Sequence, residues 1–299
     1  DSFASSYAVS SGNMSLEGVA ISDTTKAGLF DLDHKSVMFA QNIHEKSYPA
    51  SITKIMTAIL AFKHGNMDDI VTIPAEALNQ ESGSTEIGFK EGDQVTLDEL
   101  LHGLLIYSGN DAAVAIAQHI GGSVDQFVEM MNQEALELGA TNTHFANPSG
   151  LQDENHYTTV RDLTKLLSYA LQNDTFRQIY CTSEYTTSAT ASAPEGLHFL
   201  STMFKKMDSP EVNGGEIEGG KTGYTGEAGQ CLASLAKGDD VEYILVTAGA
   251  PGGPSTEPYH IEDAKAVYNR IQAGEQGSAA DTAADSQDDQ ATTETDGAA

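Results

Sequence analysis

Apolar residues recur every three or four positions along the segment that follows Ser51. The stripe comprises Ile52, Ile55, Met56, Ile59 and Leu60. This spacing is typical of one buried helix face, and Gly65 stands where a C-terminal cap belongs. The pattern therefore predicts a helix that begins at Ser51 and ends near Gly65. Because residues three apart share a helix face, the Lys54 side chain can reach the Ser51 hydroxyl.

Five further segments carry helical stripes. They cover residues 96–107, 112–120, 123–138, 163–171 and 261–271. The first begins with Thr96 and Glu99 in the spacing of a capping box, and the third begins with Ser123 and Gln126 in a similar arrangement. The triplet Ser108-Gly109-Asn110 falls between two of these helices, so it is predicted to form a tight turn that directs polar side chains into a cleft.

Predicted strands concentrate at the two ends of this helical region. Residues 27–32 and 36–40 flank a short turn, and residues 231–236 and 241–248 flank another, so each pair predicts a hairpin. Lys221-Thr222-Gly223 lies just upstream of the second hairpin and is expected on the adjoining strand. Strands, a helical insert, then strands and a helix predict an α+β fold, with an antiparallel sheet flanked by helices plus a helical subdomain.

Composition narrows the class of protein. The chain has 299 residues, 39% of them hydrophobic, and a formal net charge of −29, which argues against nucleic acid and anionic membrane surfaces as partners. No run of 18 or more apolar residues is present, and the chain lacks an initiating Met and a signal-peptide core. We expect a mature or engineered fragment. None of the nine histidines forms an H-E-x-x-H pair, so neither a metal nor a cofactor is expected.

Three regions are predicted along the chain. Residues 1–18 are interpreted as an N-terminal extension and residues 19–274 as one catalytic domain. Residues 275–299 contain seven acidic residues, no Lys or Arg and no large apolar side chain. Such a segment cannot bury enough surface to offset its ordering entropy, so we expect a disordered tail or linker.

The chain has two cysteines, Cys181 and Cys231. They could pair in an oxidising compartment, but two cysteines in a chain of this length do not form a disulfide framework. Burial statistics favour two separate buried thiols.

Three short motifs occur in one order: Ser51-Ile52-Thr53-Lys54, Ser108-Gly109-Asn110 and Lys221-Thr222-Gly223. Each alone occurs by chance in many proteins, but the ordered set indicates a serine nucleophile with a lysine base. Lysine can accept the serine proton only if its pKa falls from about 10.4 towards 7–8. A shift of roughly three units takes about 4 kcal/mol, which burial and a second cation such as Lys221 can supply.

With these motifs, the flanking residues 48–50 (Tyr-Pro-Ala) and 144–151 (His-Phe-Ala-Asn-Pro-Ser-Gly-Leu) complete a family pattern. The chain resembles the active-site-serine penicillin-recognising enzymes, and among them a low-molecular-weight penicillin-binding protein, a D-alanyl-D-alanine carboxypeptidase. The resemblance covers residues 19–271. It implies a β-lactamase/transpeptidase-like fold and an enzyme that acts outside the cytoplasmic membrane, secreted or at the cell surface. It also implies peptidoglycan stem peptides as substrates and β-lactam antibiotics as covalent inhibitors.

The resemblance also implies roles for the motif residues. Ser51 would attack the carbonyl carbon between two D-alanines, Lys54 would act as base, and Ser108 would relay a proton to the leaving amine. Asn110 would hold the substrate amide, and Lys221 would supply positive charge near Ser108. Thr222 would bind the terminal carboxylate, and Gly223 completes the third motif. The backbone N–H groups of Ser51 and Tyr224 would form the oxyanion hole.

Two alternatives stay open at this point. A class A-like β-lactamase needs a glutamate after the second motif, whereas residues 76–79 (Glu-Ala-Leu-Asn) lie before it and residues 147–151 look like the carboxypeptidase pattern. A non-catalytic cell-wall binding or sensing protein of the same fold is the second alternative. The chain also departs from relatives that carry an arginine after the last strand, because no arginine follows until Arg270.

Overall fold

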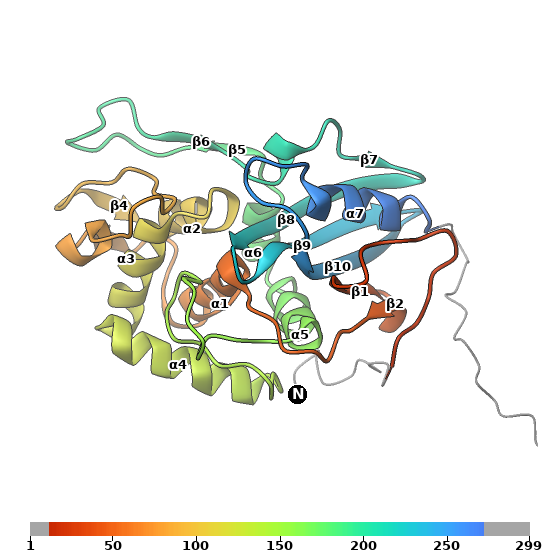
Figure 1. Cartoon of the computed structure of the whole chain (residues 1–299). Coiled ribbons are helices and arrows are strands. Elements are labelled where there is room, and N and C mark those ends of the chain that lie inside the picture. The colour runs from red at the N-terminus through yellow and green to blue at the C-terminus, as the bar shows by residue number, and fades with distance from the viewer. Residues whose placement is uncertain (1–11, 272–299) are drawn as a thin grey trace, which may run out of the picture.

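The computed structural model describes residues 12–271 (Figure 1). The acidic segment 275–299 therefore lies outside the described residues, as do residues 1–11. Met14 forms a β-bridge with Ala40, and Leu16 is buried, so the chain already packs on the domain before residue 18. In this part of the chain, every helix is too short or too polar to cross a membrane.

One six-stranded antiparallel sheet forms the centre of the molecule, in the order β2-β1-β10-β9-β8-β7. Its strands are β1 (Lys26–Asp31), β2 (Ser36–Gln41), β7 (Glu211–Val212), β8 (Gly215–Thr225), β9 (Gly229–Gly238) and β10 (Val241–Ala250). Both predicted hairpins are confirmed, as β1–β2 and β9–β10. The third motif lies on β8, the strand predicted for it. The prediction of an α+β fold with an antiparallel sheet is confirmed.

The helices occupy the predicted segments with small shifts at their ends. They are α1 (Lys54–His64), α2 (Leu97–Ile106), α3 (Asn110–Gly121), α4 (Val124–Glu137), α5 (Val160–Ala170), α6 (Asp174–Tyr180) and α7 (Tyr259–Tyr268), with 3-10 turns η2 (Ala50–Thr53), η3 (Ala75–Leu78) and η4 (Phe204–Lys206). The capping box is confirmed: the Thr96 hydroxyl accepts from the Glu99 N–H, and the Glu99 carboxylate accepts from the Thr96 N–H.

Several short elements were missed by the sequence patterns. They are α6, the two-residue strand β7, and the three-residue strands β3 (Ile70–Thr72), β4 (Gln94–Thr96), β5 (Glu184–Thr186) and β6 (His198–Leu200). Strands of three residues are too short to show a period of two, and they form only because a distant partner pairs with them. In Figure 1 the β5–β6 hairpin extends beyond the helices as a long arm.

The sheet separates two hydrophobic cores. The larger core packs α1–α6 against one face, with residues such as Phe30, Met56 and Ile244 fully or almost fully buried. The smaller core packs α7 against the opposite face, where Leu232 and Ala264 are fully buried. As Figure 1 shows, α1 and α5 lie on one side of the sheet and α7 on the other. The helical subdomain therefore faces β8 across the first face, where the motifs meet.

The two cysteines are separate thiols. Cys231 is buried in β9 and Cys181 lies at the C-terminal end of α6. The expectation of two separate thiols is confirmed, but only Cys231 is buried, whereas Cys181 is half-buried. Burial raises the pKa of each thiol to about 11.

Candidate active site

Ser51 lies in a 3-10 turn that leads directly into α1. The helix was predicted to begin at Ser51, but its α-helical part begins at Lys54, and the turn before it is η2. In a 3-10 turn the side chains at i and i+3 eclipse each other, so Lys54 still lies over Ser51. The Lys54 ammonium donates to the Ser51 hydroxyl over 2.9 Å. The tighter turn thus brings the predicted pair into contact.

Lys54 is fully buried and its ammonium has three partners. Besides Ser51, it donates to Asn110 Oδ1 and to the carbonyl oxygen of Ser149, each over 2.8 Å. Burial lowers the pKa of Lys54 to about 7, while the negative charge of Asp111 opposes that shift. A lysine with an unshifted pKa would be neutral in only roughly one molecule in 2,500 at pH 7. The buried lysine is neutral in about half, so it can serve as a base.

The second motif closes one side of the site. Ser108 has a left-handed backbone with φ of 67°, a conformation that costs a non-glycine residue energy and persists where surrounding contacts impose it. Asn110 is the first residue of α3, so the turn is shorter than the predicted triplet. Asp111 is fully buried and accepts from the N–H groups of Ile87 and Gly88, which anchors the neighbouring loop to this turn.

The third motif closes the opposite side. Lys221 is fully buried, and its pKa is lowered well below the usual value by burial and by the nearby cations Lys54 and Lys206. Its ammonium donates to the Thr222 carbonyl oxygen over 2.6 Å. The Thr222 hydroxyl pairs with that of Thr202 at 2.7 Å. The charge of Lys54 in the first motif therefore acts on Lys221 in the third.

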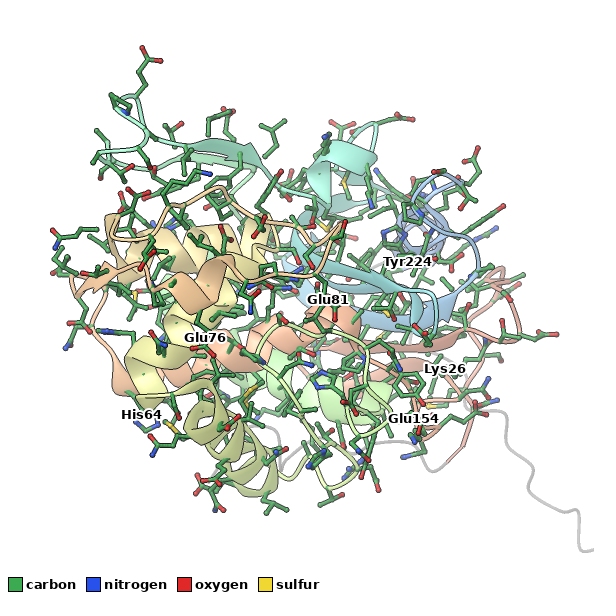
Figure 2. The ribbon with its side chains drawn as sticks, turned by 60° about the vertical axis from the view of Figure 1, so that its left-hand side comes forward. Lys26, His64, Glu76, Glu81, Glu154 and Tyr224 are labelled. Atoms are coloured by element: carbon green, nitrogen blue, oxygen red, sulfur yellow. The ribbon has the colours of Figure 1, made fainter. Side chains whose placement is uncertain are left out.

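Gly223 on β8 lies close to the backbone of Ser51. A Cβ atom there would lie 2.9 Å from the Ser51 nitrogen, so no larger residue fits without a shift. The first N–H groups of a helical turn have no acceptor within it, and the Ser51 N–H belongs to such a turn beside β8. Tyr224 follows with 41% of its surface exposed, at the open end of the strand (Figure 2).

A loop that the motifs do not include completes the floor of the site. Asn147 Oδ1 accepts from the Gly150 N–H, which presents the Ser149 carbonyl to Lys54. Buried His156 fastens this loop to the nucleophile turn, because its Nδ1 accepts from the Ala146 N–H and its Nε2 contacts the Thr53 hydroxyl at 2.7 Å. In the sequence, only the flanking pattern at residues 144–151 indicated that this loop belongs to the site. Nothing in the sequence analysis indicated Thr202.

Gly150 allows a test of this packing. Its φ is 97°, and a Cβ atom there would overlap the Ala50 carbonyl oxygen at 1.8 Å. We expect Gly150→Ala to displace the Ala50–Ser51 peptide and to slow acylation of Ser51 by a fluorescent penicillin by on the order of a hundredfold. Gly92→Ala is the matched control, since Gly92 has φ of 84° with nothing within 4 Å of its Cβ position. Equal acylation rates in both variants would contradict the expectation.

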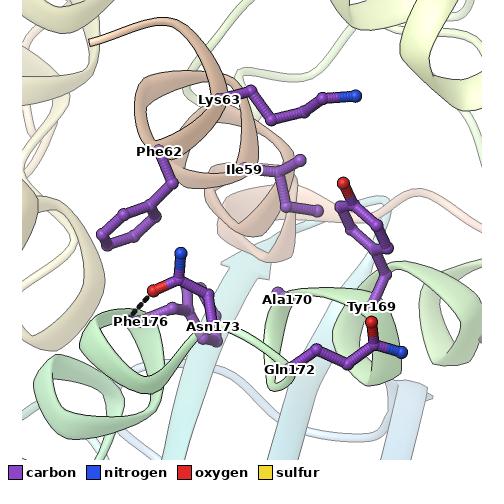
Figure 3. A pocket seen from close by; sticks show the side chains of 8 residues that line it. All are labelled: Ile59, Phe62, Lys63, Tyr169, Ala170, Gln172, Asn173 and Phe176. Carbon is purple, nitrogen blue, oxygen red and sulfur yellow. Dashed lines mark hydrogen bonds between the residues drawn. The ribbon is translucent and has the colours of Figure 1, made fainter. Parts of the chain in front are cut away.

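A pocket of about 240 Å³ lies elsewhere, at the other end of α1 (Figure 3). It is lined by Ile59, Phe62, Lys63, Tyr169, Ala170, Gln172, Asn173 and Phe176. Two of its polar side chains have partners in the protein: Lys63 pairs with Glu134, and the Asn173 side chain caps α6. This pocket contains none of the motif residues, which meet instead where η2, α1, α3 and β8 come together.

The fold brings the Ser51 hydroxyl into contact with a buried lysine, an arrangement that can activate a serine. The family model described as D-alanyl-D-alanine carboxypeptidase, peptidase family S11, matches residues 18–252. The chain therefore belongs to the D-alanyl-D-alanine carboxypeptidase family. The resemblance to penicillin-recognising enzymes is confirmed.

Curated relatives agree with this assignment. The chain is 35% identical over 233 residues to D-alanyl-D-alanine carboxypeptidase DacF of Bacillus subtilis, covering 76% of this chain and 58% of the relative. It is 33% identical over 245 residues to DacA of Escherichia coli, covering 78% and 58%. The chain thus spans less than two thirds of the length of these relatives.

Solved structures share the fold. The D-alanyl-D-alanine carboxypeptidase of Mycobacterium tuberculosis superposes with a TM-score of 0.74 at 25% identity, covering 88% of this chain and 98% of the other. A DD-transpeptidase of Streptomyces superposes with a TM-score of 0.73 at 27% identity, covering 84% and 97%.

Proposed function

We propose that this chain removes the terminal D-alanine from peptidoglycan stem peptides through an acyl-enzyme on Ser51. The observation that carries the proposal is the 2.9 Å hydrogen bond between the Ser51 hydroxyl and the buried Lys54. Neutral Lys54 takes the hydroxyl proton while Ser51 Oγ bonds to the carbonyl carbon. A proton then passes through Ser108 to the leaving amine, and D-alanine departs. Water hydrolyses the ester and restores Ser51.

The free edge of β8 supports the binding of a peptide. β8 pairs with β9 along its length but with β7 only at residues 215–216, so no described strand covers its other edge at residues 219–225. An extended peptide can add to such an edge through backbone hydrogen bonds. Asn110 would hold the substrate amide, and the N–H groups of Ser51 and Tyr224 would hold the oxyanion. Gly223 leaves the space that this arrangement needs.

The remaining roles and partners follow from the same proposal. Lys221 supplies positive charge, Thr222 binds the terminal carboxylate, and β-lactam antibiotics acylate Ser51. Such a substrate places the enzyme outside the cytoplasmic membrane. The net charge of −29 supports the expectation that nucleic acid is not a partner.

Deacylation distinguishes this proposal from a β-lactamase. The loop at Asn147–Leu151 presents the Ser149 carbonyl, not a carboxylate, to Lys54. Penicillin's ring remnant stays in the site after acylation, whereas a peptide releases D-alanine and admits water. We therefore expect fast turnover of a peptide that ends in two D-alanines and a long-lived penicillin adduct. A coupled D-alanine assay and mass spectrometry during a penicillin chase measure both.

The outcomes of this experiment separate the alternatives. A Ser51 adduct that disappears within seconds would favour the β-lactamase. An absence of both adduct and D-alanine release would favour a non-catalytic binding protein.

A further inference from the structure

The proposed substrate ends in a carboxylate, so a carboxypeptidase needs a cation that binds this end of the peptide. The three arginines of the chain are all placed elsewhere: Arg161 pairs with Asp162, Arg177 pairs with Glu242, and the Arg270 guanidinium packs on Gly18. Lys221 lies in the cleft, but its ammonium donates to the Thr222 carbonyl. Another residue must then supply an accessible positive charge, if the proposed function holds.

Two hydroxyl groups mark where a carboxylate would lie. Thr222 Oγ1 and Thr202 Oγ1 are 2.7 Å apart, and Thr222 is only 7% exposed. The Thr202 N–H donates to the Ile106 carbonyl at the end of α2, which holds Thr202 beside the second motif. Hydroxyls of this kind donate readily to a carboxylate oxygen. The pair therefore forms a polar corner between β8 and the Ser108 turn.

The 3-10 turn η4 lies against the same part of β8. Met203 immediately precedes this turn, is fully buried, and occupies the space that a Cβ atom on Gly220 would need. Lys206 is three residues further on, and its N–H donates to the Met203 carbonyl over 3.0 Å. Because side chains at i and i+3 eclipse in a 3-10 turn, Lys206 projects from the side of η4 that faces β8.

The positive charge of Lys206 affects two neighbouring titratable groups, and Lys206 forms no ion pair within residues 12–271. It lowers the pKa of Lys221 on β8 and of His260 on α7, which agrees with the packing of Met203, the residue before η4, on Gly220 of β8. None of the ion pairs among residues 12–271 includes Lys206. Lys206 thus lacks an ion-pair partner in a chain with 15 Lys and Arg against 44 Asp and Glu, and its charge repels that of Lys221. A bound anion would relieve this repulsion.

We propose that Lys206 is a specificity-determining residue that binds the terminal carboxylate of the substrate, together with the hydroxyls of Thr202 and Thr222. This inference rests on the proposed function and deepens it, because it names the group that distinguishes a free C-terminus from a peptide interior. His260 does not compete for the role. Burial lowers the pKa of His260 to about 4, so it is neutral at neutral pH.

The test compares Lys206→Met with Lys205→Met, which removes the same charge from the adjacent exposed position. The substrates are an acylated peptide ending in D-Ala-D-Ala and its C-terminal amide, which differ only in the carboxylate. We expect Lys206→Met to lower kcat/KM for the acid by on the order of tenfold, mainly through KM, while leaving the amide unchanged. Lys205→Met should change neither, and Lys206→Arg should retain the preference for the acid.

Acylation by a penicillin and by its methyl ester gives a second measurement that does not depend on peptide turnover. Lys206→Met should slow acylation by the free acid and not by the ester. The inference is overturned if Lys206→Met matches Lys205→Met on both acids, or if it slows acid and amide equally. If the wild-type protein releases no D-alanine but the penicillin pair still distinguishes Lys206 from Lys205, the proposed function fails and carboxylate binding by Lys206 stands.

Discussion

Replacing Ser51 with alanine abolishes both D-alanine release and the penicillin adduct, if Ser51 is the nucleophile. The loss should be roughly 10⁴-fold or more, because no acyl-enzyme can form without the hydroxyl. A coupled D-alanine assay and intact-protein mass spectrometry measure the two effects. Ser36→Ala on β2 is a control that removes a hydroxyl far from the cleft. Activity retained in Ser51→Ala would refute the assignment.

Lys54→Met should be nearly as damaging, and its effect should not add to that of Ser51→Ala. When two residues act as one catalytic unit, removing either one abolishes most of the rate enhancement that the pair provides. The double variant should therefore be no less active than the worse single variant. Met keeps a side chain of similar length in the buried position while removing the base. Acylation by a fluorescent penicillin measures the loss, and a melting curve checks that the variant is folded.

The pH profile sharpens the same prediction. The pKa of Lys54 is about 7, and the neutral form is the base, so kcat/KM should rise with pH and reach half its plateau near pH 7. Asp111 raises the pKa of Lys54, so Asp111→Asn should move this midpoint to lower pH. Asn keeps an acceptor for the Ile87 N–H that Asp111 now binds. A midpoint that moves upward, or stays unchanged, would contradict the role assigned to Lys54.

Several features of the site lower the stability of the folded protein. Two lysines are fully buried in one cleft, and Ala50 and Ser108 hold left-handed backbones with φ of 47° and 67°. Buried cations and strained residues persist only where surrounding structure imposes them, and they cluster at functional sites. Here the two hydrophobic cores on the faces of the sheet are the surrounding structure that holds these residues in place. The low pKa of Lys54 is thus a consequence of the same burial that makes the site costly.

Local patterns in the sequence were enough for much of the fold. The stripe after Ser51, the capping box at Thr96 and the two hairpins each depend on neighbours within a few residues, and all are present in the structure. Their ends moved where tertiary contacts compete with periodicity, as at Asn110, which enters α3. Elements of three residues, such as β5 and β6, were missed because a short strand has no pattern of its own.

The sequence by itself determined the family, the order of the three motifs and the pairing of Ser51 with Lys54, because a spacing of three residues defines their geometry locally. Only the tertiary structure decided what surrounds that pair. The Ser149 carbonyl reaches Lys54 from 95 residues away, and the Thr202 hydroxyl meets that of Thr222, which is 20 residues further along the chain. Such contacts leave no periodic trace, since chain folding and burial, not local spacing, bring their atoms together. The position of η4 and Lys206 beside β8 likewise depends on tertiary packing and has no local sequence signal.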